Sequence, residues 1–531
     1  MNERLRAALD GYLELRCHLD PVEATFIGRH EHDGRFGRYD QDSVREALAA
    51  LRSYTSELEE AGADTVEEEI DRTAALHAAR HDILMLERER PFARNPEFHL
   101  SHALNGLFLL LVRAPHDPAQ RANALLSRLR ALPEFLDTAK ERLTNPSRVF
   151  IETASDMLAG GHALLGDGLD DPSLDLTALE PAELEDARVR AADALLTFGD
   201  ALALLSESAR DDFAIGRDLF DRKLHTAHMI QENADELARL GERMRASAEA
   251  ELRAASATIA PGVHWRDVVD RLRADVPRPD TAIAEYDDAM QSAREFTIER
   301  RLMAVTPSEI QVAPTPDFLR ALTPVAAYLG AGAYDQDQRG LFLVTLPDDG
   351  QPWRAHCRAE LPSAVAHEGI PGHHQQIAIR NALPQPVRRV ITTPASLEGW
   401  AMYCEHLMAE QGFLRTPEEK LFAAHHLLWR ALRVVLDVSL HTRGMSRETA
   451  ARKLQDELGI DAAVADAEAR RYCAHPTYQL CYAVGLRDIL RLRDDARRAG
   501  GDSFSLAAFH DALLSYGALP IVLARWGMGL A

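Results

Sequence analysis

The chain has 531 residues, of which 46% are hydrophobic and 27% charged, and this composition excludes a disordered or collagen-like chain. Its 60 Lys and Arg residues against 83 Asp and Glu residues give a net charge of −23. A surface with this much negative charge repels phosphate backbones and anionic lipids. We therefore expect no nucleic-acid partner and no membrane partner.

The cysteines and the first residues predict a cytoplasmic protein. The five cysteines include no C-x-x-C pair, and their odd number fits a reducing compartment better than a disulfide framework. The opening MNERLRAALDGYLEL is charged throughout and has no apolar segment typical of a signal peptide. No apolar run approaches the roughly 18 residues of a membrane span.

The first 260 residues are predicted to be helical. Their apolar residues recur at spacings of three and four, for example over 43–62 and 123–143, and such positions usually form a core. We therefore expect an N-terminal helical lobe over 1–260.

The second half is predicted to form a catalytic lobe over 261–531. Prolines interrupt the helical pattern at 261–279, and the pattern returns from 361 to the C-terminus. Between them, RGLFLVTLP (339–347) is a short apolar, β-branched run that predicts a strand. The expected fold is mainly α, large and two-lobed, with a small β element near 339–347, and the two lobes form one compact unit.

The chemistry is concentrated in AVAHEGIPGHHQQIAIRN (364–381). It places His367, Glu368, His373 and His374 within eight residues. Imidazole is a good zinc ligand, and a Glu beside a ligand can act as general base on a water at the metal. The H-E-x-x-H motif is absent, because Pro371 stands four residues after His367.

A regular helix would not bring these histidines together. His373 would point to the wrong face, and His374 would lie about 10.5 Å along the axis from His367. Pro371 cannot donate a helical hydrogen bond, so it favours a local distortion. A two-residue bulge at Ile370–Pro371 would place His373 as the second ligand, and a three-residue bulge would place His374.

A third ligand is expected in SLEGWAMYCEHL (396–407). Glu398 would complete a set of two histidines and one glutamate and leave one coordination position open for water. Glu405 follows seven residues later on the same helix face. It is either an outer partner of a ligand or a solvated charge.

These motifs resemble those of a known family. HEGIPGHHQQ resembles the H-E-x-x-P-G-H-[HY]-x-Q signature of the bacterial domain of unknown function 885 family, which is grouped with the gluzincin metallopeptidases. EGWAMYCE resembles that family's E-G-W-A-x-Y-x-E block, and its Glu resembles the third zinc ligand of aminopeptidase N-type gluzincins. Weaker resemblances at 21–36, 437–450 and 475–485 extend the match almost end to end.

The resemblance implies a mostly helical fold with a deep central cleft. It also implies that His367, His373 and Glu398 hold Zn²⁺, although the same set can hold other first-row divalent metals. His373 is favoured over His374 because the family accepts Tyr at the latter position. Glu368 would take a proton from water and pass it to the leaving amine. His374 would orient a ligand or touch substrate.

Four further residues are candidates with plain structural alternatives. Asp437 and His441, four residues apart, either orient a ligand or stabilise an oxyanion, or form a structural polar pair on one helix face. Tyr482 either donates to an oxyanion or lies in the core. Arg339, before the predicted strand, either binds a substrate carboxylate or is a surface residue.

The favoured function is a zinc-dependent hydrolase of amide bonds, a metallopeptidase that acts on short peptides. One alternative is a metal-dependent amidase acting on a small N-acyl or amide metabolite. Another is a non-catalytic helical binding protein. Metal content separates the binding protein from the two enzymes, and substrate profiling separates the enzymes from each other. Exo- or endo-cleavage and the oligomeric state stay open.

Overall fold

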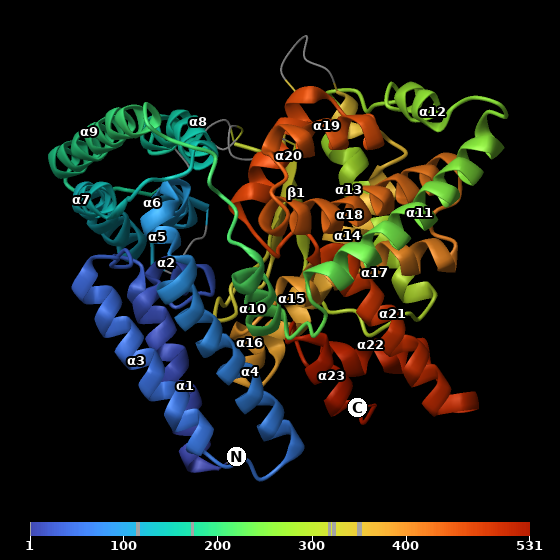
Figure 1. The fold of residues 1–531 in the computed structure, drawn as a ribbon, viewed down its shortest axis with the longest axis horizontal. Helices are drawn as coiled ribbons and strands as arrows, with labels where there is room; N and C mark the ends of the chain where they lie inside the picture. The colour runs from blue at the N-terminus through green and yellow to red at the C-terminus, as the bar shows by residue number, and fades with distance from the viewer. Residues whose placement is uncertain are drawn as a thin grey trace. The chain divides into compact units, whose positions relative to one another are not determined.

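The computed structural model describes residues 2–112, 117–170, 175–316, 320, 325–347 and 353–530. Figure 1 shows helices throughout and one small sheet, which confirms the predicted mainly α fold with a small β element. None of the helices in these residues is long and apolar enough to cross a membrane.

The chain divides into two compact units. The first unit comprises the described residues of 1–213, 316–324 and 332–337, and the second comprises those of 214–315, 325–331 and 338–530. This boundary differs from the one expected at residue 260. The reason is that α11 (Ala234–Ile259) packs along α18 (Pro417–Thr442), which belongs to the second unit.

The first unit is helical. Several of its helices begin with proline, whose missing N–H and fixed φ suit the first helical position. The segment 332–337 joins this unit through the Tyr334 N–H, which donates to the Ile27 carbonyl at 2.9 Å. The helices are α1 (Glu3–Leu19), α2 (Pro21–Phe26), η1 (His30–His32), α3 (Gln41–Glu60), α4 (Val66–Leu84), η2 (Met85–Glu89), α5 (Pro91–Arg94), α6 (Pro96–Val112), α7 (Pro118–Arg142), α8 (Arg148–Leu165) and α9 (Pro181–Ser206).

The second unit contains the sheet and the remaining helices. Besides α11 and α18, its helices are α10 (Arg217–His228), α12 (Trp265–Leu272), α13 (Ala282–Glu299), η4 (Arg354–His356), α14 (Leu361–Glu368), α15 (His373–Ala382), α16 (Pro386–Val390), α17 (Pro394–Gln411), α19 (Arg447–Leu458), α20 (Ala462–Ala474), α21 (Cys481–Gly500), η5 (Gly501–Ser503), α22 (Leu506–Leu514) and α23 (Ile521–Gly527).

The sheet has three strands in the order β1-β3-β2. β1 (Ile310–Pro314) pairs parallel with β3 (Gly340–Val344), and β2 (Ala326–Leu329) pairs antiparallel with it. The predicted strand at 339–347 is thus the central strand, and Phe342, Leu343 and Val344 in it are buried. β1 and β2 gave no strand signal because they are short and only half-buried.

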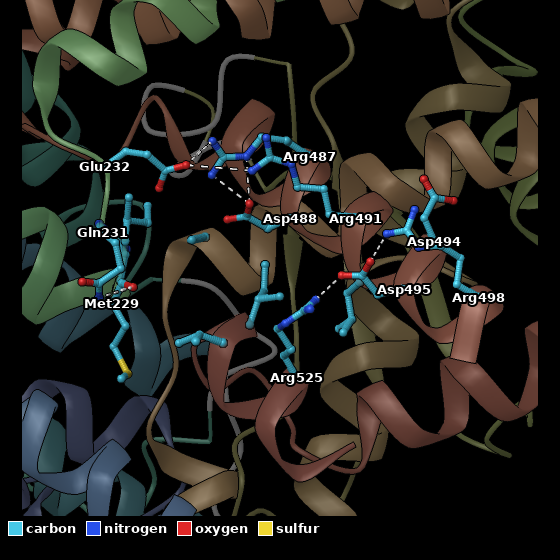
Figure 2. A pocket seen from close by; sticks show the side chains of 16 residues that line it. Met229, Gln231, Glu232, Arg487, Asp488, Arg491, Asp494, Asp495, Arg498 and Arg525 are labelled. Carbon is cyan, nitrogen blue, oxygen red and sulfur yellow. Dashed lines mark hydrogen bonds and ion pairs between the residues drawn. The ribbon is translucent and has the colours of Figure 1, made fainter. Parts of the chain in front are cut away.

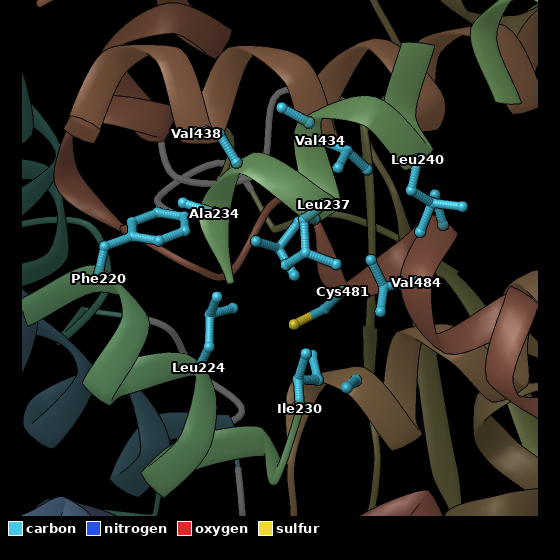
Figure 3. Packing of buried hydrophobic residues seen from close by; sticks show 14 residues of the cluster. Phe220, Leu224, Ile230, Ala234, Leu237, Leu240, Val434, Val438, Cys481 and Val484 are labelled. Atoms are coloured by element: carbon cyan, nitrogen blue, oxygen red, sulfur yellow. The ribbon is translucent and has the colours of Figure 1, made fainter. Parts of the chain in front are cut away.

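A core of apolar side chains fixes the helices that carry the candidate site. In Figure 3, Leu237 and Leu240 of α11 face Val434 and Val438 of α18, with Val484 of α21 beside them. All belong to one buried cluster, and burial of each such side chain contributes about 1.5–3 kcal/mol. α18 and α21 are therefore held by a common apolar contact with α11.

Candidate metal centre

The His-rich segment forms two helices and not one bulged helix. α14 ends at Glu368 and α15 begins at His373, with a turn over 369–372 that includes a cis Ile370–Pro371 peptide. The predicted bulge is therefore a complete break. A Cβ on Gly372 would collide with the His367 carbonyl, so only glycine allows the turn to fold back this closely.

The turn and α17 are tied together by Trp400. Its indole Nε1 donates to the Pro371 carbonyl at 3.0 Å and to the Gly372 carbonyl at 3.3 Å. Gln376 of α15 adds a bond from its amide to the Ser396 carbonyl of α17 at 3.3 Å. Trp400 belongs to the EGWA motif and Gln376 to the HEGIPGHHQQ motif, so each motif supplies one of the side chains that hold the two segments together.

Three metal-ligand side chains converge as a result. The Nε2 atoms of His367 and His373 lie 3.6 and 3.5 Å from Oε2 of Glu398. One donor atom from each of the three residues lies within 4.8 Å of the others. All three side chains are largely buried.

This donor set fits a tetrahedral zinc ion. Zn–N and Zn–O bonds of about 2.0–2.2 Å in a tetrahedron separate neighbouring donors by about 3.3–3.5 Å. The two measured N–O separations are close to that range. Two imidazoles and one carboxylate leave a fourth position for water or substrate.

Glu405 orients His367. The His367 Nδ1–H donates to Oε1 of Glu405 at 2.8 Å, so in the neutral ring Nε2 is the lone-pair atom on the side of Glu398. Beyond it, His426 lies 3.7 Å from Glu405 and 3.5 Å from Glu360. Glu405 is 5% exposed, so it is an outer partner of a ligand and not a solvated charge.

The carboxylates create a field that favours a cation. Burial opposes the charged imidazolium of His367, but hydrogen bonds to Glu398 and Glu405 outweigh it and raise its pKa to about 10. Burial alone would raise the pKa of Glu398, yet its contacts with His367 and His373 hold that pKa well below the usual range. For Glu405 too, burial opposes ionisation, but hydrogen bonds with His367 and His426 outweigh it and lower the pKa.

Tyr478 is a site residue that the sequence reasoning missed. Its hydroxyl donates to Oε1 of Glu398 at 2.6 Å and so leaves Oε2 as the oxygen that faces the two histidines. Burial and the nearby Glu398 charge raise its pKa. The sequence feature that could have pointed to Tyr478 is its position four residues before Tyr482, in the same sequence block.

Glu368 and Tyr482 lie beside the three donors. Glu368, at the end of α14, is half-exposed and has no hydrogen bond or ion pair with any residue that the structure describes. The Tyr482 ring lies nearly parallel to that of His367, with centroids 6.4 Å apart. Its hydroxyl has no hydrogen-bond partner within the described ranges.

His374 and Arg339 are not brought to the donors. His374 is hydrogen-bonded to the Tyr328 hydroxyl at 3.0 Å and to the Ser308 carbonyl at 3.1 Å, so it joins α15 to the sheet region. Arg339 is exposed just before β3. The structure therefore groups His373, and not His374, with His367 and Glu398.

Asp437 and His441 contact backbone groups. Asp437 accepts hydrogen bonds from the N–H groups of Thr477 and Leu480 at 3.2 and 3.4 Å, and burial raises its pKa to about 7. His441 Nε2 donates to the Tyr472 carbonyl at 2.9 Å. Asp437 thus anchors the segment from which Tyr478 reaches Glu398, and its effect on the site is indirect.

A spacious pocket lies elsewhere. It has a volume of about 570 Å³ and lies at α21 and α23, where Figure 2 shows arginines facing carboxylates. No predicted site residue is among the described residues that line it. The pairs there neutralise one another, as between Arg487 and Glu232 at 2.7 Å.

Comparisons with known proteins bear on the family and the fold. A family described as "Bacterial protein of unknown function (DUF885)" matches residues 21–526. A "putative lipoprotein of unknown function" from Shewanella oneidensis has a similar structure, with a TM-score of 0.81, 22% identity and 99% of both chains covered. A "putative lipoprotein" from Colwellia psychrerythraea gives a TM-score of 0.83 at 18% identity, covering 99% of this chain and 98% of that one.

At these identities the structural likeness shows the fold alone. The comparison with curated proteins found no match. The family match covers both motifs and every candidate residue named above, as the resemblance of those motifs implied. The chain therefore belongs to the family of bacterial proteins of unknown function DUF885.

Proposed function

We propose that this protein is a metal-dependent hydrolase of amide bonds, a gluzincin-like metallopeptidase that acts on short peptides. One observation carries the proposal. The Nε2 atoms of His367 and His373 face a single oxygen of Glu398 at 3.6 and 3.5 Å, and the charge of the half-exposed Glu368, the next residue, acts on His367. The donor set favours zinc, although other first-row divalent metals suit the same ligands.

Each residue has a defined part in the proposed reaction. A bound zinc ion supplies Lewis acidity and makes water a better nucleophile near neutral pH. His367, His373 and Glu398 would hold the ion, and Glu405 and Tyr478 keep two of these ligands in orientation. Glu368 takes the proton of the attacking water and returns it to the leaving amine. The Tyr482 hydroxyl can donate a hydrogen bond to the developing oxyanion.

The location of the protein in the cell is part of the proposal. The predicted location is the cytoplasm, whereas the two similar structures are of proteins described as lipoproteins. Fractionation of cells that express the native gene separates the two locations, because a cytoplasmic protein stays with the soluble fraction without detergent.

Glu368→Gln tests the chemical step. We expect this variant to bind zinc as the native protein does and to lose about 10²–10⁴-fold in peptide hydrolysis, because only the base is removed. Zinc content is measured by elemental analysis, and hydrolysis by mass spectrometry on a library of short peptides. Glu418→Gln, an acid-to-amide change in the first turn of α18, is the matched control and should leave both unchanged.

Three results would contradict the proposal. Hydrolysis by Glu368→Gln at the native rate would remove the base from the mechanism. A zinc-loaded native protein that cleaves no peptide, but cleaves N-acyl or amide metabolites, would make it an amidase. Absence of both activities would favour a binding protein.

A further inference from the structure

Arg430 is a cation close to the candidate metal centre, where its charge acts on Glu405 without forming an ion pair with it. It lies on α18 one turn after His426, the residue that contacts Glu405. The side chain is half-buried, and its Nε is enclosed without a hydrogen-bond partner. Among the residues that the structure describes, no carboxylate forms an ion pair with it. Burying part of an unpaired guanidinium is costly, so a missing anion is expected there.

The Tyr482 ring connects Arg430 with the metal ligands. The Arg430 Cζ lies 5.8 Å from the centroid of that ring. The same ring lies nearly parallel to that of His367 with 6.4 Å between the centroids. Together these distances place the Arg430 Cζ no more than about 12 Å from the centre of the His367 ring. An extended peptide advances about 3.5 Å per residue, so a substrate carboxylate one or two residues from the cleaved bond lies within that distance.

Neighbouring arginines leave the region with excess positive charge. Arg433 pairs with Glu468 at 2.7 Å, and Arg471 lies 3.8 Å from the same carboxylate. Arg433, Arg471 and Arg430 all act electrostatically on Tyr482. Of these three guanidinium groups, Arg433 and Arg471 share Glu468, and Arg430 has no carboxylate within ion-pair distance among the described residues. The Arg471 side chain is 42% exposed, so it too can reach a bound anion.

The arginines of the pocket in Figure 2 show the usual arrangement in this protein. Arg487 pairs with Glu232 and Asp488, and Arg525 pairs with Asp495. A pocket neutralised in this way offers no net charge to a ligand. The unmatched charge at Arg430 stands beside the candidate metal centre instead.

We propose that Arg430, assisted by Arg471, binds a carboxylate of the substrate. The preferred substrates are then short peptides whose carboxylate lies one or two residues beyond the bond that is cleaved. A guanidinium suits this task because it binds a carboxylate through two parallel hydrogen bonds. This inference rests on the proposed hydrolase function and defines its substrate class. The carboxylate is either the free C-terminus or an acidic side chain.

The test compares matched peptides with the zinc-loaded protein. Tripeptides and tetrapeptides of one sequence are supplied with a free or an amidated C-terminus. A third set is amidated and carries Glu or Gln next to the C-terminus. The variants are Arg430→Gln, Arg430→Lys and Arg471→Gln. Arg491→Gln, an exposed arginine of α21 that lines the pocket of Figure 2, is the control. Thermal unfolding of each variant checks that it folds.

We expect native protein and Arg491→Gln to cleave free-acid peptides at least tenfold more efficiently than amides, through a lower KM. Arg430→Gln should lose this preference, because its KM for free-acid peptides rises to that for amides, and Arg430→Lys should recover part of it. If the preference follows Glu over Gln in the amidated set, the bound group is a side-chain carboxylate.

Two outcomes overturn the inference and are distinct from each other. The carboxylate site is refuted, and the hydrolase function is not, if the native protein prefers neither free acids over amides nor Glu over Gln in the amidated set, or if Arg430→Gln keeps the native preference. If Arg430→Gln does not fold, the loss of the preference for a carboxylate is measured in Arg471→Gln instead. Failure of zinc-loaded native protein to cleave any peptide refutes the peptidase function and this inference with it.

Discussion

The orientation of single imidazoles decides how well the candidate site can hold a metal. His367 has one ring nitrogen bound to Glu405 and the other directed toward Glu398. Glu398 in turn gives one oxygen to Tyr478 and the other to the histidines. Two of the three proposed ligands, His367 and Glu398, are thus fixed by a partner on the opposite side, which raises metal affinity by reducing the freedom lost on binding.

Glu405→Ala should weaken zinc binding by about 10–100-fold, because His367 loses the partner that fixes its ring and tautomer. The change removes no proposed ligand, so zinc should still bind when supplied in excess. Competition with a chromophoric chelator measures the affinity. Glu418→Ala, also an acidic residue outside the three-donor group, is the control. Native affinity in Glu405→Ala would show that the contact is structural only.

Local sequence spacing predicts part of this site. His367, Glu368 and Glu398 are selected by residue chemistry and spacing, whereas His373 is preferred to the adjacent His374 only through the family resemblance. Tyr478 offers only its place in the 475–485 block, and Arg430 gives no signal. Tyr478 matters because of where the 475–480 segment folds back, and Arg430 because it lacks a partner. Both properties depend on contacts between residues distant in sequence.

At the scale of elements, the site depends on the close approach of two helices. α17 carries Glu398 and α21 carries Tyr482, and they meet where Gly399 faces Gly485. A Cβ added at Gly399 would lie 2.6 Å from the Gly485 Cα, and one added at Gly485 would collide with the Ala395 carbonyl. The two glycines therefore set the distance between these helices.

Gly485→Ala should destabilise the protein by about 3 kcal/mol, because the new methyl group forces α17 and α21 apart. The shift should also lower zinc affinity, since Glu398 moves with α17. Urea unfolding and zinc titration measure the two effects. Gly500→Ala in the same helix is the control, because its Cβ would meet Phe504 at an ordinary 3.4 Å. Equal stability of both variants would contradict this account of the helix contact.

The helices themselves are predictable from apolar spacing, but their breaks are less so. The break between α14 and α15 was expected as a bulge, since Pro371 signals a lost hydrogen bond without giving its extent. The extent is set by Gly372, which lets the turn fold against the His367 carbonyl, and by Trp400, which binds the turn from another helix. Neither contact can be read from local spacing.

At the scale of the whole molecule, the second unit contains the complete proposed machinery. His367, His373, Glu398 and Arg430 all lie in it, on α14, α15, α17 and α18. The sequence placed its start at 261 because prolines interrupt the helical pattern there. It starts at 214 because α10 and α11 bury their apolar faces against α18 and α21. Amphipathic spacing reveals an apolar face but not its partner.

The most direct measurement is the zinc content of three proteins purified without chelator: native, His373→Ala and His374→Ala. The two histidines are adjacent in sequence, but only His373 faces Glu398, while His374 contacts Tyr328 and Ser308. We predict about one zinc per chain in the native protein and in His374→Ala, and none in His373→Ala. Native protein that takes up no first-row metal, or full zinc retention in His373→Ala, would contradict the proposed metal centre.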